Sequence, residues 1–350
     1  GAILSAEHEL YLALFREGLR RCMAEEDVND VHNWLTETLL KMGGKSDGDG
    51  VLWWEDTFAF YDALLAKREA DAAIPASERK ALLWAWASWN RMIDPLPPGM
   101  LAVISAGDGM GKTTYAEMLA EEWALQRNKV VFVHYELNHA VMMDRRYARH
   151  TGMTARDLKS GELTPIQRQL VREAHDKLRI IRGGITYQHS AGWTMERTVA
   201  RLRQLKADGL CDVVVIDYLE KNAASRRQLQ MFGSSPYQRE ADNVEQIKNF
   251  AELTETPVVL LAQMSKAGKT ADFSDIDRTS MRGAGEKSEK ANVVVLLHRD
   301  KDDSSEGAYS NTVNVRVDKN TLGPTGKFVQ WMRPETFSVY DVDTVRTELN

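Results

Sequence analysis

The sequence is poor in cysteine, with only Cys22 and Cys211 among its 350 residues. Two cysteines cannot build a disulfide framework, and no Cys or His spacing in the chain suits a zinc site. This excludes small disulfide-stabilised folds and zinc modules. The low count is typical of proteins of the reducing cytoplasm.

Long hydrophobic runs and an excess of positive charge are also missing. No apolar run approaches the length that crosses a bilayer, so no membrane segment is expected. The chain begins Gly-Ala-Ile-Leu-Ser, without an initiator methionine or a basic-then-apolar signal pattern, which leaves open a part upstream of residue 1. With 45 basic and 51 acidic residues the net charge is −6, so there is no general attraction to nucleic acid. Any DNA contact must come from local loops.

The motifs of serine hydrolases are absent as well. There is no Gly-x-Ser-x-Gly elbow, and His8, His32 and His189 stand in no partner pattern. The chain does have the composition of a globular protein, with 27% charged and 43% hydrophobic residues, and its length suits one large and one small domain.

The most informative stretch is a glycine-rich loop between an apolar run at 100–104 and an amphipathic segment from Tyr115. The order strand, glycine loop, helix with Gly-Lys-Thr at its end is the pattern of a P-loop, in which backbone N–H groups surround a phosphate. Lys112 would reach the outer phosphates and Thr113 would ligate Mg²⁺. The residues expected to bind ATP are Gly107, Asp108, Gly109, Met110, Gly111, Lys112, Thr113 and Thr114. A dinucleotide-binding fingerprint is set aside because its third glycine is missing.

From Met100 onward, apolar runs of strand length alternate with amphipathic segments, which predicts a mostly parallel sheet covered by helices. The expected strands lie at 101–104, 130–134, 180–181, 213–216, 258–262, 293–297, 313–317 and 328–332. Two polar stretches between elements, 226–239 and 266–285, are candidates for mobile functional loops.

The first 92 residues are predicted to be helical. Apolar residues recur at helical spacing in four segments, the last of them capped by Ser77 and running through Trp89. Six of the nine tryptophans fall in this region with few interleaved basic residues, which favours a helical core or a packing surface against a neighbouring subunit over a stacking platform for nucleic acid. The Pro-rich stretch 93–99 is expected to be a linker.

Three strand ends carry candidate site side chains, two of them catalytic and one for metal binding. Glu136 follows the strand at 130–134 and is the candidate general base that orients water for attack on the γ-phosphate. Asp217 ends a buried strand in the Walker B form and is expected to hold Mg²⁺ through its water shell. Gln263 ends a third strand, where it would sense the γ-phosphate.

With these motifs in place, residues from about 95 to 345 resemble the replicative hexameric helicases of the RecA-like superfamily, of the DnaB type and the phage primase-helicase type. The matching segments are 110–114, 135–138, 216–219, 282–285 with 291–292, 298–300 and 319–326. The family also carries an arginine at the position of Arg145. Arg299 matches an arginine that packs against the base in phage relatives.

The chain departs from the family at the arginine finger, which falls at Thr321. In the family a lysine stands two residues before the arginine finger, and of these two basic residues only the lysine, Lys319, is present here. A lysine lacks the guanidinium fork of arginine. The hypothesis is that Lys319, or Arg316 in its place, acts on the nucleotide of a neighbouring subunit.

DNA contacts are expected from the two polar stretches, whose basic residues would line the pore of a ring. They are Arg226, Arg227, Arg239, Lys266, Lys269 and Arg282.

The resemblance thus implies a RecA-like α/β P-loop NTPase at 100–345, a linker at 93–99 and a small helical domain at 1–92 that forms a collar or docks on a neighbouring subunit. It implies an ATP- and Mg²⁺-dependent DNA helicase that forms a homo-oligomer, a hexamer in the family, on single-stranded DNA and works with replication proteins such as primase. Two alternatives stay open: a recombinase or regulatory RecA-like ATPase, and a weakly hydrolysing nucleotide-gated scaffold or loader.

Overall fold

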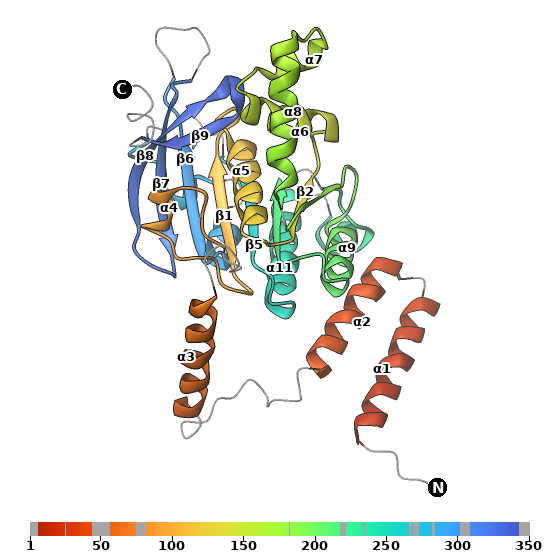
Figure 1. Ribbon diagram of the computed structural model, residues 1–350. Coiled ribbons are helices and arrows are strands. Elements are labelled where there is room, and N and C mark those ends of the chain that lie inside the picture. Colours follow the sequence, from red (N-terminus) through yellow and green to blue (C-terminus); the bar gives the residue numbers. More distant parts are fainter. Residues whose placement is uncertain are drawn as a thin grey trace.

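The computed structural model of the chain describes residues 6–24, 26–43, 57–74, 82–181, 183–217, 222–233, 235–265, 268, 273–281, 284–301 and 309–342. Figure 1 shows one large body built around a twisted sheet, with the first three helices beside and below it. Within the described residues, no helix combines the length and the apolar character needed to cross a membrane.

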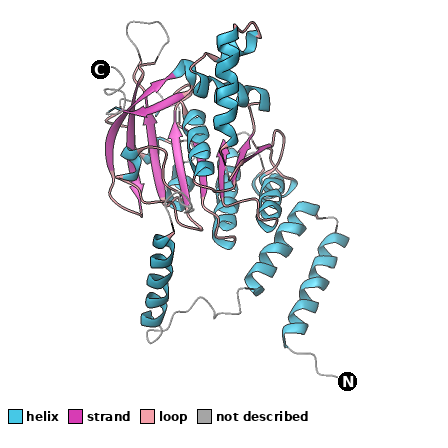
Figure 2. Cartoon of the chain, in the orientation of Figure 1, coloured by secondary structure: helices cyan, strands magenta, loops and turns pink. Residues whose placement is uncertain are grey.

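The large body is organised by one sheet, whose strands are drawn in magenta in Figure 2. The sheet has nine strands in the order β3-β2-β4-β5-β1-β6-β7-β8-β9. The pairs from β3 to β6 are parallel, and the last three strands add antiparallel to that edge. The strands are β1 Leu101–Ala106, β2 Val130–His134, β3 Ile185–His189, β4 Val213–Asp217, β5 Val258–Gln263, β6 Val293–His298, β7 Thr312–Asn320, β8 Gly326–Arg333 and β9 Ser338–Asp341. The predicted α/β class with a mostly parallel sheet is confirmed.

Helices cover both faces of this sheet. Side chains of β1 alternate between two buried clusters, with Ile104 on the side of α5 and Val103 on the side of α9 and α11. Burial on both faces explains why the central strands are continuous apolar runs. The helices are α1 Ala6–Met23, α2 Val28–Gly43, α3 Thr57–Ala73, α4 Ala87–Asn90, α5 Lys112–Leu125, α6 His139–Thr151, α7 Ala155–Ser160, α8 Pro165–Arg179, α9 Met195–Ala207, α10 Arg226–Phe232, α11 Pro236–Leu253 and α13 Ala284–Lys290, with short 3₁₀ turns η4 Arg278–Ser280 and η5 Pro334–Thr336.

The strand predicted at 180–181 is wrong. Ile180 caps the C-terminus of α8 and is 63% exposed, and the strand at this edge is β3, after Gly184. The apolar pair ends an amphipathic helix that begins with a capping box at Thr164 and a proline at its first turn, which are strong start signals. Strand β9 was not predicted, because four residues give too short a pattern.

The stretch 226–239 is also not the loop that its polarity predicted. Ser225 caps α10 with Gln228 as its reciprocal partner, and Ser235 caps α11 ahead of Pro236. Serine caps and a proline at the first helical turn start helices even in polar segments. In the stretch 266–285 the structure describes residues 268, 273–281, 284 and 285.

Of the fourth helix predicted in the N-terminal region, the described residues contain only the single turn α4. The predicted cap of that helix, Ser77, lies outside the described residues. Trp86 is extended, and the Asn90 side chain donates to the carbonyls of Trp84 and Trp86 at 2.8 and 3.1 Å. These side-chain hydrogen bonds satisfy backbone carbonyls that a longer helix would have satisfied with its own N–H groups. The extended backbone lets the indoles of Trp84 and Trp86 reach the sheet.

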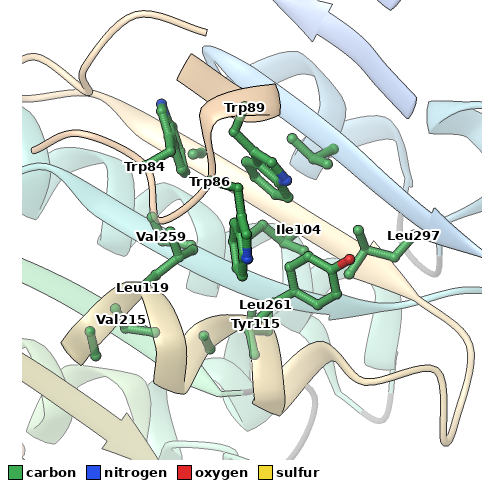
Figure 3. Packing of buried hydrophobic residues seen from close by; sticks show 14 of the residues in the cluster. Trp84, Trp86, Trp89, Ile104, Tyr115, Leu119, Val215, Val259, Leu261 and Leu297 are labelled. Atoms are coloured by element: carbon green, nitrogen blue, oxygen red, sulfur yellow. The ribbon is translucent and has the colours of Figure 1, made fainter. Parts of the chain in front are cut away.

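The tryptophans of this segment are core residues. Trp84, Trp86 and Trp89 are buried and form a contiguous cluster that meets Tyr115 of α5 (Figure 3). The Trp89 indole donates to Gln330 of β8 at 3.0 Å. The prediction of a core role is confirmed for these three tryptophans, although the core that they join is that of the sheet and not a purely helical one.

The stretch predicted as a linker continues into the same core, because Ile93 and Leu96 are 0% and 2% exposed. By contrast, α3 has no buried residue and lies apart from the large body in Figure 1. Helix α2 lies beside α9, where Arg203 donates to Glu37 at 2.8 Å and to the Asn33 side chain at 3.1 Å, and α1 packs against α2.

Candidate functional site

The P-loop lies where the sequence predicted it, between the end of β1 and the start of α5. Gly109 and Gly111 have positive φ angles of 72° and 100°, which only glycine adopts without strain. A Cβ on Gly111 would also lie 2.9 Å from the Met332 thioether. The Lys112 ammonium is buried and donates to the carbonyls of Ala106 and Gly107 at 3.0 Å each. The loop is thus closed by its own lysine at the positive end of a 14-residue helix.

A cavity of about 550 Å³ opens above this loop and gathers most of the predicted nucleotide-site residues. Its lining includes Gly107, Asp108, Gly109, Gly111, Lys112, Thr113, Thr114, Glu136, Asp217, Gln263 and Arg299. Met110 is the predicted loop residue that does not line it, since its buried side chain packs beneath Gly107. The carboxyl ends of parallel strands meet at one sheet edge, which explains how segments far apart in sequence share one cavity.

Asp217 and Thr113 form the candidate metal-binding pair. Asp217 ends β4 and is 7% exposed, and its burial raises the pKa of the carboxyl to about 6, opposed in part by a hydrogen bond from Thr113. Among the described residues, no group of three or more His, Cys, Asp or Glu could hold a metal ion. One carboxylate and one hydroxyl beside a phosphate cavity suit Mg²⁺, which keeps several waters and takes substrate phosphates as ligands.

Glu136 and Gln263 border the cavity from two other strand ends. Glu136 follows β2 and is exposed at the mouth of the cavity. Gln263 pairs in register with Ala106 of β1 and donates to Asp108 at 2.9 Å. Gln263 therefore touches the P-loop directly, so a change at the loop can be transmitted to β5.

Arg299 is buried against the other side of the loop. Its guanidinium donates to the carbonyls of Ser310, Tyr309 and Gly109 at 2.7, 3.2 and 3.3 Å and lies 5.7 Å from the centre of the Tyr309 ring. Burial lowers its pKa from the usual value. These contacts fix Arg299 at the cavity wall.

The sequence prediction missed the wall formed by Met332, Pro334 and Phe337, which the end of β8 and the turn η5 supply. Arg145, noted only by resemblance, lines the same cavity, donates to Thr114 at 3.1 Å and lies 4.5 Å from the centre of the Phe337 ring. No motif marks the wall residues, and the only local signal is the proline before the turn.

Lys319 does not reach this cavity. It pairs in register with Val294, near the end of β6 opposite the P-loop, and its ammonium donates to the carbonyls of Ser288 and Glu289 at 2.9 and 3.0 Å. Burial lowers the pKa of Lys319. Arg316 is held by Asp318 at 2.7 Å and by the Ile276 carbonyl at 2.7 Å.

The candidate DNA-binding residues are placed unequally. Arg226 is exposed at the start of α10, whereas Arg227 pairs with Asp242 at 2.5 Å and with Glu196 at 3.2 Å. Arg239 is half-buried beside a cavity of about 240 Å³. Lys266, Lys269 and Arg282 lie outside the described residues.

A buried histidine borders the site on β2. His134 pairs in register with Asp217, and its ring centre lies 5.0 Å from that of His189 and 5.3 Å from that of His139. His134 is 1% exposed, and burial lowers its pKa to about 4. A neutral ring is therefore part of the folded state.

We expect His134 to make folding acid-sensitive. Between pH 6.5, the usual pKa of histidine, and about pH 4, His134 is protonated in the unfolded chain but neutral in the folded one. The free energy of unfolding therefore falls as the pH drops from 6.5 to about 4. Between pH values of about 7 and 4.5 the loss of the free energy of unfolding is about 2 kcal/mol. Urea unfolding at pH values of about 7, 5.5 and 4.5 measures it.

The variant His134→Gln isolates this effect, because Asp217 titrates in the same range with the opposite sign. Its stability should fall less on acidification than that of the wild type, while His32→Gln, at a position outside the core, follows the wild type. Equal acid dependence of His134→Gln and the wild type would show that the ring is not held neutral.

The comparisons with known proteins agree with this arrangement. Residues 85–338 match the family model described as DnaB-like helicase C terminal domain. The replicative DNA helicase DnaB of Geobacillus stearothermophilus is 24% identical over 243 residues, which cover 68% of this chain and 51% of that protein. The replicative DNA helicase DnaC of Bacillus subtilis (strain 168) is 24% identical over 313 residues, 86% of this chain and 64% of that protein. The chain thus spans about half to two thirds of the length of these relatives.

Solved structures support the same fold. One that is described as an ATPase domain superposes with a TM-score of 0.69 at 20% identity and covers 84% of this chain and all of that one. A DnaB-like replicative helicase, described together with its interactions with primase, superposes with a TM-score of 0.67 at 17% identity, covering 95% of this chain and 76% of that one. At these identities the likeness shows the RecA-like ATPase fold.

Proposed function

The chain belongs to the DnaB-like helicase C-terminal domain family, and from this membership and the site geometry we propose that it is an ATP-dependent replicative DNA helicase. The observation that carries the proposal is the single cavity that joins the P-loop to Glu136, Asp217 and Gln263. A P-loop together with three strand-end side chains is what phosphoryl transfer from a nucleotide to water requires.

We propose that ATP binds with its phosphates at the loop N–H groups and Lys112. Thr113 and Asp217 would hold Mg²⁺, which neutralises phosphate charge when bound. Glu136 accepts a proton from the attacking water. The water oxygen forms a bond to the γ-phosphorus, while the bond between the γ-phosphorus and the oxygen that leaves with ADP breaks. Gln263 reports the loss of the phosphate. The apolar wall at Met332, Pro334 and Phe337, with Arg299, is left for the nucleoside.

Lys319 is proposed to act in trans within a ring, a hexamer as in the family. Its position away from its own P-loop supports action on a neighbour's nucleotide. We expect Lys319→Ala to lower ATP turnover at least about tenfold while nucleotide binding is retained, because a charge near the transferred phosphate stabilises the transition state. Lys129→Ala is the matched control, since Lys129 also donates to a carbonyl, that of Gly209 at 2.7 Å.

Mixing subunits tests the direction of action. In a mixture of Lys319→Ala and Lys112→Ala subunits, some interfaces combine an intact Lys112 with an intact Lys319 from the neighbour. Turnover should exceed that of either variant alone. A Lys319→Ala ring that hydrolyses ATP at the wild-type rate would refute the role of this lysine.

Single-stranded DNA is the proposed substrate track. Arg226 is the best placed of the described candidates, whereas the ion pairs of Arg227 favour a structural role. Arg239 and the candidates outside the described residues, Lys266, Lys269 and Arg282, complete the proposal. Binding through such contacts should weaken steeply with salt.

We propose that the ATPase domain begins at about residue 82 and extends to about residue 345, since residues 82–90, called the Trp84 segment, share its core through Trp84, Trp86 and Trp89 and the family match begins at residue 85. The helices before it would form a collar or dock on a neighbouring subunit, for which the unburied helix α3 is the best placed. Primase is proposed as a partner from the likeness to a helicase described with primase. The free thiols Cys22 and Cys211 favour the cytoplasm.

A weakly hydrolysing scaffold is the second candidate, favoured by Thr321 at the finger position and by the carbonyl contacts of Lys319. Strand displacement on a forked duplex separates the candidates. A helicase displaces the strand only with a hydrolysable nucleotide. A scaffold, or a recombinase-like ATPase, assembles with nucleotide and leaves the duplex paired.

A further inference from the structure

A cluster of buried charges lies behind the nucleotide cavity, between α5 and α6. Its members are Glu117, Glu121, Arg145, Arg146, Arg149 and His150. The Glu121 carboxylate receives Arg146, Arg149 and His150 at 2.8, 2.8 and 2.9 Å. These contacts join the helix that follows the P-loop to the helix that follows Glu136.

The cluster is tightly interlocked. Glu117 and Glu121 have side chains only 2% and 9% exposed. The guanidinium of Arg149 is the largest influence that lowers the pKa of Glu121, against the effect of burial. Removing one member of such a buried ion pair is strongly destabilising, because the charge of its partner stays buried without compensation. The two helices are therefore held in one arrangement.

Arg149 also reaches beyond the two helices. Its Nη1 donates to the backbone carbonyl of Phe337 at 2.7 Å, and its side chain is 7% exposed. Phe337 has φ 51° and ψ 48°, a left-handed conformation that is uncommon for residues other than glycine. Such backbone persists only where the surroundings enforce it. The hydrogen bond from Arg149 is one such restraint, and the bond from the Phe337 N–H to the Pro334 carbonyl at 3.3 Å is another.

The conformation of Phe337 sets the position of its ring. Phe337 lines the nucleotide cavity, and the guanidinium of Arg145 lies 4.5 Å from the centre of its ring. Arg145 in turn donates to Thr114 of the P-loop helix and pairs with Glu117 at 3.2 Å. The chain of contacts from Arg149 to Phe337 to the cavity is continuous.

We infer that Arg149 is a positioning residue that sets the affinity of the site for the nucleoside part of the nucleotide, through the carbonyl and ring of Phe337. The inference rests on the proposed function, because it takes the occupant of the cavity to be a nucleoside triphosphate. The phosphates are bound at the P-loop, whereas the hydrogen bonds of Arg149 go to Glu117, Glu121 and Phe337. Of these three partners only Phe337 lines the cavity, so we expect the loss of Arg149 to act mainly on the nucleoside end.

The test compares Arg149→Met with Arg146→Met as its matched control. Arg146 lies on the same helix and pairs with the same Glu121, but its ring contact is Tyr187 and not Phe337. The dissociation constants of ATP and of inorganic triphosphate are measured for each variant by calorimetry. A wild type that binds neither ligand would contradict the proposed function itself.

We expect Arg149→Met to weaken ATP binding about tenfold and triphosphate binding less than about twofold. Arg146→Met should leave both constants within about twofold of the wild type, although both variants lower the melting temperature. In a Phe337→Ala background, Arg149→Met should add no further loss of ATP affinity, as expected when one residue acts through the other.

Unchanged ATP affinity in Arg149→Met, equal weakening for ATP and triphosphate, or full additivity with Phe337→Ala would each overturn the inference. If Arg149→Met does not fold, Arg149→Lys carries the same cycle with Phe337→Ala. A lysine keeps the charge but lacks the fork that serves Glu121 and Phe337 together. Its ATP affinity should fall between those of the wild type and Phe337→Ala, and wild-type affinity would contradict the inference.

Discussion

Replacing Lys112 by alanine is expected to lower ATP turnover by about 10³-fold. Its ammonium closes the P-loop through the Ala106 and Gly107 carbonyls, the position from which it would turn to the outer phosphates. Removing one such preorganised donor from a developing charge typically costs about 10²–10³ in rate, and weaker nucleotide binding adds to the loss. Steady-state phosphate release measures the effect.

The control for Lys112→Ala is Lys248→Ala. Lys248 is also partly buried and donates to the Gly99 carbonyl at 3.3 Å and the Asn292 side chain at 3.1 Å, away from the cavity. Both variants should keep the helical circular dichroism of the wild type, but only Lys112→Ala should lose turnover. A similar loss in both would mean that the change acts through folding and not through the phosphate site.

Replacing Glu136 by glutamine is expected to lower turnover by about 10²–10⁴-fold without weakening ATP binding. The amide keeps the shape of the side chain but cannot accept the proton of the attacking water. The exposed position of Glu136 at the mouth of the cavity makes a loss of folding stability small. Turnover and the ATP dissociation constant are measured on the same preparation.

Glu122→Gln is the matched control for Glu136→Gln, because Glu122 accepts a hydrogen bond from Gln126 near the end of α5 and does not line the cavity. It should hydrolyse ATP at the wild-type rate. Wild-type turnover in Glu136→Gln would contradict the proposed role of Glu136 as general base and would mean that another group at the cavity accepts the proton.

The sequence was sufficient to predict the parts of the site that are locally encoded. The P-loop requires glycines at 109 and 111 and a lysine at 112, and both glycines indeed have positive φ. The buried strands ending at Asp217 and Gln263 are continuous apolar runs, so their ends could be located as well. Parallel pairing then places these ends at one edge without further information.

The cavity wall could not be predicted in the same way. Met332, Pro334 and Phe337 come from an antiparallel addition to the sheet, and their side chains become site residues only through the register of β8 and β9. The buried charges of α5 and α6 have the same origin. Glu117 and Arg149 look like ordinary helix-surface residues until the two helices pack together.

The Trp84 segment and the stretch 226–239 show the limits of composition. Tryptophans at helical spacing predicted a helix, but burial against the sheet and the side-chain bonds of Asn90 favoured an extended segment. Polarity predicted a loop at 226–239, but the serine caps start helices there. In both cases a few specific contacts outweighed the average character of the stretch.

The central claim is that the P-loop cavity hydrolyses ATP and that hydrolysis is coupled to single-stranded DNA. The most direct measurement is the ATP turnover of the assembled wild type with and without single-stranded DNA. We predict turnover that rises several-fold with DNA, and a rise that disappears at high salt. Turnover that is the same with and without DNA in an assembled, ATP-binding protein would contradict the claim.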